Sequence, residues 1–205
     1  MAEATVGSPA VAVGVPHEAP ARPDFEIVPL RGLPFVGAAL VGLIIAIAGN
    51  WLWALDFFHI VGGALWTAID LFVGLVVGPI LGRLSIQARV EFMKQFMPKM
   101  LLIMPTLVIM TLTSGWQLAR HLSVLAAPYP QHWWVNASFI VVGVMSVIAL
   151  GVLEPANVAV LFELKKPRPN GALIGTLMRR FIYTAGITGL MQVATLVIMT
   201  RIATW

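Results

Sequence analysis

Residues 59–82, HIVGGALWTAIDLFVGLVVGPILG, form the stretch that decides the fold. The run is almost entirely apolar, and Asp70 is the only Asp, Glu, Lys or Arg within it. A helix rises 1.5 Å per residue, so a run of this length can cross the ~30 Å hydrocarbon core of a bilayer. The sequence therefore predicts a membrane-spanning helix over residues 56–82.

Four further segments are long and apolar enough to do the same, which makes five predicted spans: 33–53, 56–82, 97–121, 134–162 and 178–203. Apolar residues are 59% of the 205 and charged residues only 11%, a composition outside the range of soluble domains. We predict an all-α integral membrane bundle over residues 31–205, a four-helix core plus one amino-terminal span, preceded by a mobile cytoplasmic tail, residues 1–30. The alternative is four spans, with the first segment lying in the membrane interface.

Basic residues and tryptophans indicate the orientation. All of the 13 Lys and Arg residues except Arg120 and Arg201 fall in the tail, around residues 83–99 or around residues 165–180. The positive-inside rule places these regions in the cytoplasm, so the amino terminus is cytoplasmic and the carboxyl terminus periplasmic or extracellular. Tryptophans favour the headgroup region, and six fall at the opposite, outer level: Trp51, Trp53, Trp116, Trp133, Trp134 and Trp205. We therefore predict a bacterial inner-membrane protein whose basic residues serve topology, with no nucleic-acid partner.

The chain contains no cysteine, which limits the metal chemistry open to it. Disulfides, iron–sulfur clusters, thiolate zinc sites and covalently attached c-type haem are all excluded. A metal would have to be held by His, Met, Asp or Glu. A b-type haem, which is held without covalent bonds, is compatible with this composition.

Three histidines are predicted to meet at the outer membrane face. His59 opens the second span, His121 closes the third and His132 precedes the fourth. Haem iron bound by two histidines requires imidazoles from different helices at similar depth, and these three provide candidates for that site or for another metal. The alternative is that they are ordinary interfacial side chains, because histidine is amphipathic.

Neighbouring residues extend this hypothesis to a haem pocket. Gly62 and Gly63 follow His59 by one helical turn, where missing side chains would leave room for a flat macrocycle. Arg120 could hold haem propionates through charge-assisted hydrogen bonds. The predicted haem b site therefore comprises His59, Gly62, Gly63, Trp66, Arg120, His121 and His132.

Two acidic residues are predicted to lie inside the membrane. Asp70 shares one helical face with Asp56, His59 and Trp66, and lies about 16 Å below His59. Glu154 is in the inner half of the fourth span, before Pro155 and near Asn157. Charged groups at this depth are costly and often functional, so Asp70 and Glu154 are candidates for a proton path. The structural alternatives are a helix–helix hydrogen bond for Asp70 and repair of the proline break for Glu154.

A methionine stripe enters the third span at helical spacing, at Met93, Met97, Met100 and Met104. Thioethers bind Cu(I), so the stripe is compatible with copper transport. Methionine is also a common adaptable packing residue.

The run HIVGGALW resembles the His-x6-Trp helix of the small membrane haem proteins that include HemJ-type protoporphyrinogen oxidase. It is also similar to copper-resistance D-type domains and related uncharacterised integral membrane families. The segment MPTLVIMTLTSGW, with Pro105 and Gly115, resembles the helix that follows in those proteins, and the likeness covers about residues 55–165. It implies that His59 is an axial ligand of b-type haem. A lysine expected in HWWVNASF is replaced by Asn136, which argues against porphyrinogen oxidation.

Three functions are compatible with these features. The leading hypothesis is a b-type haem protein that relays electrons near the outer face, between an outer-side donor and quinone. The alternative is a non-catalytic accessory subunit that binds other membrane subunits in a larger complex. A third is transport of copper or a small solute. No catalytic residue is identified, so the sequence leaves open whether the protein is an enzyme.

Overall fold

The fold, seen here in a computed structural model that describes residues 26–204, is built from helices throughout that range. The chain begins with the short helix η1 (Leu30–Gly32), followed by α1 (Leu33–Ala48). The second span comprises α2 (Leu52–Phe72), the π-helical segment η2 (Val73–Val77) and α3 (Gly78–Arg83). The third span is α4 (Ile86–His121), which the short helix η3 (Val124–Ala126) follows. The fourth comprises α5 (Gln131–Ile148), the π-helical η4 (Ala149–Leu153) and α6 (Glu154–Leu164), and the fifth is α7 (Gly171–Ala203).

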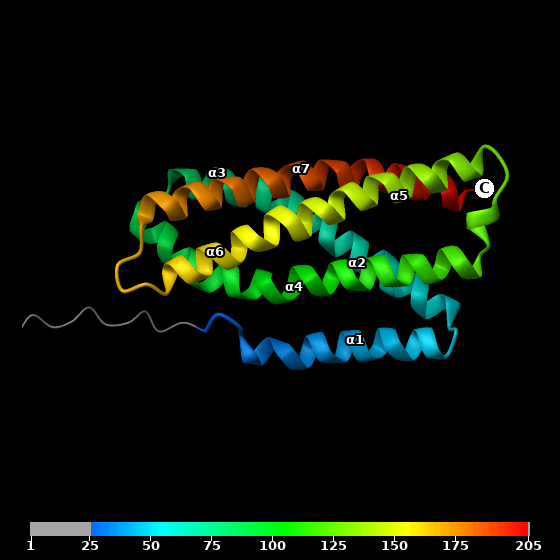
Figure 1. Cartoon of the computed structure of the whole chain (residues 1–205), viewed down its shortest axis with the longest axis horizontal. Helices are drawn as coiled ribbons and strands as arrows, with labels where there is room; N and C mark the ends of the chain where they lie inside the picture. The colour runs from blue at the N-terminus through cyan, green and yellow to red at the C-terminus, as the bar shows by residue number, and fades with distance from the viewer. Residues whose placement is uncertain (1–25, 205) are drawn as a thin grey trace, which may run out of the picture.

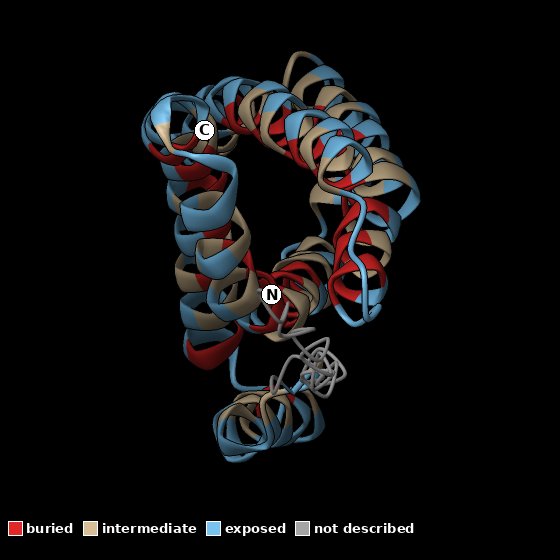
Figure 2. Ribbon diagram, turned by 90° about the vertical axis from the view of Figure 1, so that its left-hand side faces the viewer, coloured by how far each residue is buried: buried red, intermediate tan, exposed pale blue. Residues whose placement is uncertain are grey.

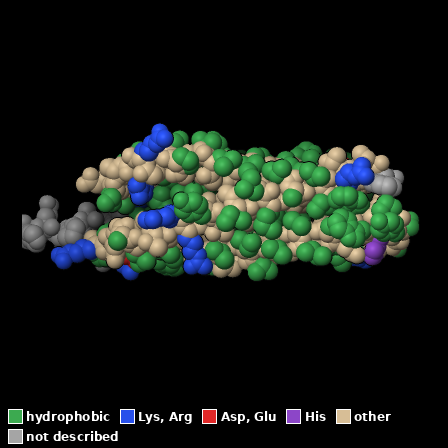
Figure 3. All heavy atoms as spheres, turned by 90° about the horizontal axis from the view of Figure 1, so that it is seen from above, with side chains coloured by type: hydrophobic (Ala, Val, Ile, Leu, Met, Phe, Trp, Pro, Cys, Tyr) green, Lys and Arg blue, Asp and Glu red, His purple; other side chains and the backbone are tan. Residues whose placement is uncertain are grey.

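The all-α membrane bundle is confirmed, because five helices in the described range are long and apolar enough to cross a bilayer. Four of them form the main bundle, and α1 runs alongside it against α2 and α4 (Figures 1 and 2). The orientation of α1 along the bundle favours five spans over four. Apolar side chains cover the middle of the surface, whereas Lys and Arg lie toward the ends, mostly at one of them (Figure 3).

The predicted bounds were wrong at three places. The helix α4 begins at Ile86 rather than at residue 97, and α7 begins at Gly171 rather than at 178. Hydropathy identifies only the part of a helix inside the bilayer, and the charged residues that precede it are themselves good helix formers. The turn between the first two spans is also earlier than predicted, because α1 ends at Ala48 and α2 begins at Leu52.

The core divides into a main cluster within the four-helix bundle and a smaller one beneath α1. All four methionines of the predicted stripe are buried in the main cluster. The stripe therefore serves as packing surface of the bundle. Of the predicted tail, residues 1–25 lie outside the described range, while Ile27 packs against the main core.

The second and fifth spans approach each other most closely at a pair of glycines. A Cβ atom on Gly74 would lie 2.5 Å from the Cα atom of Gly186 and 2.9 Å from its nitrogen. No side chain fits at this distance, so the two backbones are in direct contact. Small residues permit the same close approach in many membrane helix pairs.

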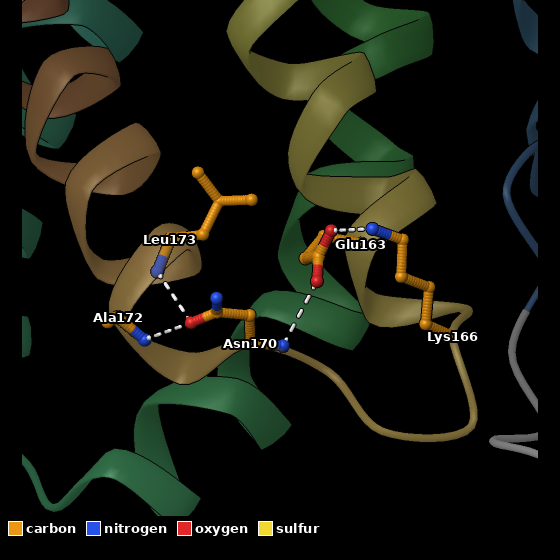
Figure 4. Close-up of polar contacts among 5 residues, drawn as sticks. All are labelled: Glu163, Lys166, Asn170, Ala172 and Leu173. Carbon is orange, nitrogen blue, oxygen red and sulfur yellow. Dashed lines mark hydrogen bonds and ion pairs between the residues drawn. The ribbon is translucent and has the colours of Figure 1, made fainter.

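The connection between α6 and α7 is held by a short polar network (Figure 4). Glu163 accepts a hydrogen bond from the Asn170 backbone N–H and forms an ion pair with Lys166. The side chain of Asn170 then accepts hydrogen bonds from the N–H groups of Ala172 and Leu173. Asn170 is therefore the N-cap of α7, and Glu163 fixes its position.

Replacing Asn170 by alanine is expected to lower the free energy of unfolding by about 1 kcal/mol, the usual cost of losing a polar N-cap. For a chain of this size the loss corresponds to a fall in Tm of roughly 2–4 °C. Thermal unfolding of the detergent-solubilised protein measures it. Asn136→Ala, at an exposed position of α5, is the matched control and should leave Tm unchanged. Equal Tm values for the two variants would contradict the capping role.

Candidate functional site

A polar centre lies inside the main bundle, where α2 meets α7. The Asp70 side chain is buried, with only 2% of its surface exposed. Its Oδ2 atom accepts a hydrogen bond from the Thr188 hydroxyl at 3.0 Å and one from the Gln192 amide at 3.2 Å. The predicted helix–helix hydrogen bond of Asp70 is thus present, and it joins the second span to the fifth.

The position of Gly189 explains how α7 reaches Asp70. A Cβ atom at Gly189 would lie 3.0 Å from the backbone nitrogen of Leu71, so α7 passes directly over the turn of α2 that carries Asp70. Thr188 and Gln192 are four residues apart and therefore lie on one face of α7. Both side chains consequently reach the same carboxyl group.

The polar centre contains groups that can exchange hydrogen-bond roles. Thr188 has one hydroxyl hydrogen, yet the Asp70 carboxyl and the backbone carbonyls of Thr184 and Ala185 all lie 3.0 Å from its oxygen. Gln192 Oε1 is buried without a hydrogen-bond partner among the described residues. Thr188 can therefore donate to an ionised Asp70, or turn to a backbone carbonyl and accept from a protonated one.

Glu154 and Asp70 line the same small cavity. The cavity has a volume of about 20 Å³, which is room for about one water molecule. Asp70 and Glu154 are the two acidic groups that line it, and the rest of the lining is apolar: Met104, Pro105, Val108, Ala149, Leu150, Leu153 and Phe181. The fold therefore brings together the two acidic residues that the sequence singled out as a possible proton path.

Both acids adjoin π-helical segments. The segment η2 begins three residues after Asp70, and η4 ends immediately before Glu154. Widened turns of this kind are rare and often occur at functional sites. Glu154 makes no hydrogen bond with the described residues, so its carboxyl does not repair the helix break before Pro155.

His59 lies between α2 and α4, closer to the membrane surface. Its Nδ1 atom is 2.9 Å from the carbonyl oxygen of Thr111. A carbonyl only accepts, so Nδ1 carries a proton and donates it, and in the neutral imidazole the Nε2 atom then has a free lone pair. The imidazole lies against Gly115, where a Cβ atom would be 2.6 Å from Cε1.

The glycines after His59 have a different role from the one expected. A Cβ atom on Gly62 would lie 2.6 Å from Thr111 Oγ1, and one on Gly63 would lie 3.5 Å from Thr111 Cγ2. Gly62 therefore makes room for α4, where we had expected room for a macrocycle, while a Cβ atom on Gly63 would make only an ordinary contact with Thr111. Trp66 is likewise buried in the main core, one turn before Asp70.

The remaining candidate residues lie on the surface. Arg120, His121 and His132 are exposed, and Asn136 donates a hydrogen bond of 2.9 Å to His132 Nε2. Residues 26–204 contain no group of three or more His, Asp or Glu side chains that could hold a metal ion. The structure thus does not gather the three histidines into a metal centre.

Thr188 and Gln192 are site residues that we did not identify from the sequence. Two polar residues one turn apart in an otherwise apolar span do provide a signal, since a membrane helix buries such groups against another helix. The partner of that face, however, depends on the packing of α2 against α7.

Comparison with family models, curated proteins and solved structures yields no match to this chain. The candidate site is therefore defined by its own residues and contacts.

Proposed function

We propose that this multi-pass membrane protein handles protons within the bilayer, with Asp70 as the proton-binding group and Glu154 as its exchange partner. One observation carries the proposal: carboxyl groups from two different spans line the same water-sized cavity, whose other lining residues are apolar. Placing an acidic residue at this depth costs free energy, and such residues commonly belong to proton relays. The reaction class is proton transfer, either alone or coupled to movement of a small solute.

The side chains around Asp70 can form hydrogen bonds with both the ionised and the protonated form of its carboxyl group. When Asp70 is ionised, Thr188 and Gln192 both donate to Oδ2. When Oδ2 takes up a proton, Thr188 can turn its hydroxyl to the carbonyl of Thr184 and accept from the acid. On release, the O–H bond at Oδ2 breaks and the proton passes across the cavity to the carboxylate of Glu154.

The orientation of the bundle in the membrane is proposed from its charge distribution. Basic residues gather at one end of the bundle, which we assign to the cytoplasmic side of a bacterial inner membrane (Figure 3). At the other end, the Arg201 guanidinium lies 5.8 Å from the centre of the Trp134 ring. The amino terminus is then cytoplasmic and the carboxyl terminus is outside.

Proton flux into vesicles tests the proposal. The full chain is reconstituted in liposomes that contain a pH-sensitive dye, and a potassium diffusion potential drives proton entry. The wild type should acidify the lumen, whereas the double variant Asp70→Asn/Glu154→Gln should match empty liposomes. Glu163→Gln is the control, since that carboxyl group belongs to the α6–α7 connection. Equal flux through the wild type and the double variant would overturn the proposal.

A b-type haem at His59 is the second candidate function, because the contact with Thr111 leaves Nε2 free to bind iron. A bound haem would supply one-electron chemistry, for example between an outer-side donor and quinone. The Nε2 atom of His59 is a suitable ligand for iron. The space beside Gly62 and Gly63, however, is occupied by α4.

The haem candidate predicts one b-type haem per chain in the purified wild type and none in His59→Ala. A reduced-minus-oxidised spectrum with pyridine haemochrome quantification measures both. Asp70→Asn should retain the haem, because Asp70 contacts α7 and His59 contacts α4. A colourless wild type, purified from cells supplied with haem, would eliminate this candidate.

A further inference from the structure

A second, larger cavity lies between α3 and the first turns of α7, at the basic end of the bundle. Its volume is about 440 Å³, within the range of small-molecule sites. Two arginines line it, Arg89 at the start of α4 and Arg179 on α7. The rest of the lining includes four glycines and Tyr183: Gly74, Gly78, Gly82, Gly175 and Tyr183.

The cavity exists because the two spans separate beyond their point of contact. The backbones touch at Gly74 and Gly186, and one turn further the nearest part of α7 to Gly78 is the side chain of Ile182. A Cβ atom on Gly82 or Gly175 would meet nothing within 4 Å. The spans thus diverge toward the basic end, and the missing side chains leave the space between them open.

The two arginines give this space a positive charge. Arg89 donates from Nη2 to the carbonyls of Gly82 and Leu84, at 3.4 and 3.2 Å, which fixes its guanidinium at the end of α3. Its Nε atom is buried and has no hydrogen-bond partner among the described residues. Neither Arg89 nor Arg179 forms an ion pair with a carboxylate in residues 26–204. Guanidinium groups bind phosphate through charge-assisted hydrogen bonds.

The surface beside the cavity continues as apolar side chains. Leu75 and Ile80 on one span, and Tyr183 and Ile187 on the other, are each more than half exposed. In a membrane these side chains face acyl chains. A ligand with both a phosphate group and a hydrocarbon tail would therefore contact the arginines and this apolar surface together.

We propose that the cavity binds the phosphate headgroup of one anionic phospholipid, with Arg89 and Arg179 as its ligands and the acyl chains against the adjacent apolar surface. Basic pockets between membrane helices are suited to such headgroups. This proposal rests on the membrane-spanning fold and is independent of proton transfer at Asp70.

Native mass spectrometry of the full chain, titrated with phosphatidylglycerol, tests the proposal. One lipid should bind per chain with preference over phosphatidylcholine, and Arg179→Gln should weaken binding about tenfold, the effect of one charge-assisted hydrogen bond. Gly175→Leu should weaken it similarly by filling the cavity. Arg180→Gln is the matched control, because Arg180 is the exposed neighbour of Arg179 and does not line the cavity.

Three results would overturn the proposal. Equal losses in Arg179→Gln and Arg180→Gln would indicate a diffuse surface charge. Equal binding of phosphatidylcholine would show that the headgroup charge is not recognised. Displacement of the lipid by millimolar inorganic phosphate would indicate a site for a soluble anion.

Discussion

Asp70→Asn is expected to reduce proton flux through the bundle by about a hundredfold, the lower range of what a positioned proton-transfer group contributes. The amide cannot bind and release a proton as the carboxyl does, so the step at Oδ2 is lost. Vesicle acidification measures the change. Thr188→Val should give a smaller loss, because it removes one hydrogen bond but retains the carboxyl group.

The fold should survive Asp70→Asn. Asparagine has the shape of aspartate, its carbonyl can accept from Thr188, and its NH₂ group can donate to Gln192 Oε1, which lacks a partner. The unfolding temperature should therefore change by only a few degrees, in contrast to the flux. Wild-type flux through a folded Asp70→Asn variant would contradict the role of Asp70.

Gly74→Leu is expected to be the most destabilising single change within the spans. The new side chain would begin 2.5 Å from the Cα atom of Gly186, so the two backbones must separate to accommodate it. Overpacking of this kind costs about 3 kcal/mol, and the corresponding fall in Tm is roughly 6–12 °C. Intrinsic tryptophan fluorescence during heating of the detergent-solubilised protein measures it.

Gly143→Leu provides the matched control for Gly74→Leu. Gly143 is an exposed glycine within α5, and a Cβ atom there would meet nothing within 4 Å. Leucine at that position should leave Tm unchanged or raise it slightly, since leucine is the better helix former. Equal destabilisation by the two variants would show that the contact of Gly74 with Gly186 is not what holds the spans together.

The number and type of the helices could be predicted from the sequence because each span is a long apolar run. The first residues of α4 and α7 could not be predicted, because hydropathy does not detect helical turns that lie outside the bilayer. The π-helical segments η2 and η4 were also missed, because no local residue pattern distinguishes a widened turn from an ordinary one.

The candidate site was predicted in part. Asp70 and Glu154 were identified because carboxyl groups inside apolar runs are conspicuous. Their meeting at one cavity, however, depends on how four spans pack, which sequence periodicity does not specify. The glycines near His59 show the same limitation, because their spacing is compatible with a macrocycle or with a neighbouring helix, and here they contact α4.

Infrared spectroscopy of the full chain in lipid, recorded across a pH titration, tests the central claim most directly. The C=O stretch of a protonated carboxyl group is resolved from that of a carboxylate, so it reports proton binding inside the membrane. We predict a carboxyl band that titrates reversibly in the wild type and is missing in Asp70→Asn, while Glu163→Gln retains it. A titration identical in the wild type and Asp70→Asn would show that Asp70 does not exchange a proton, and would contradict the account.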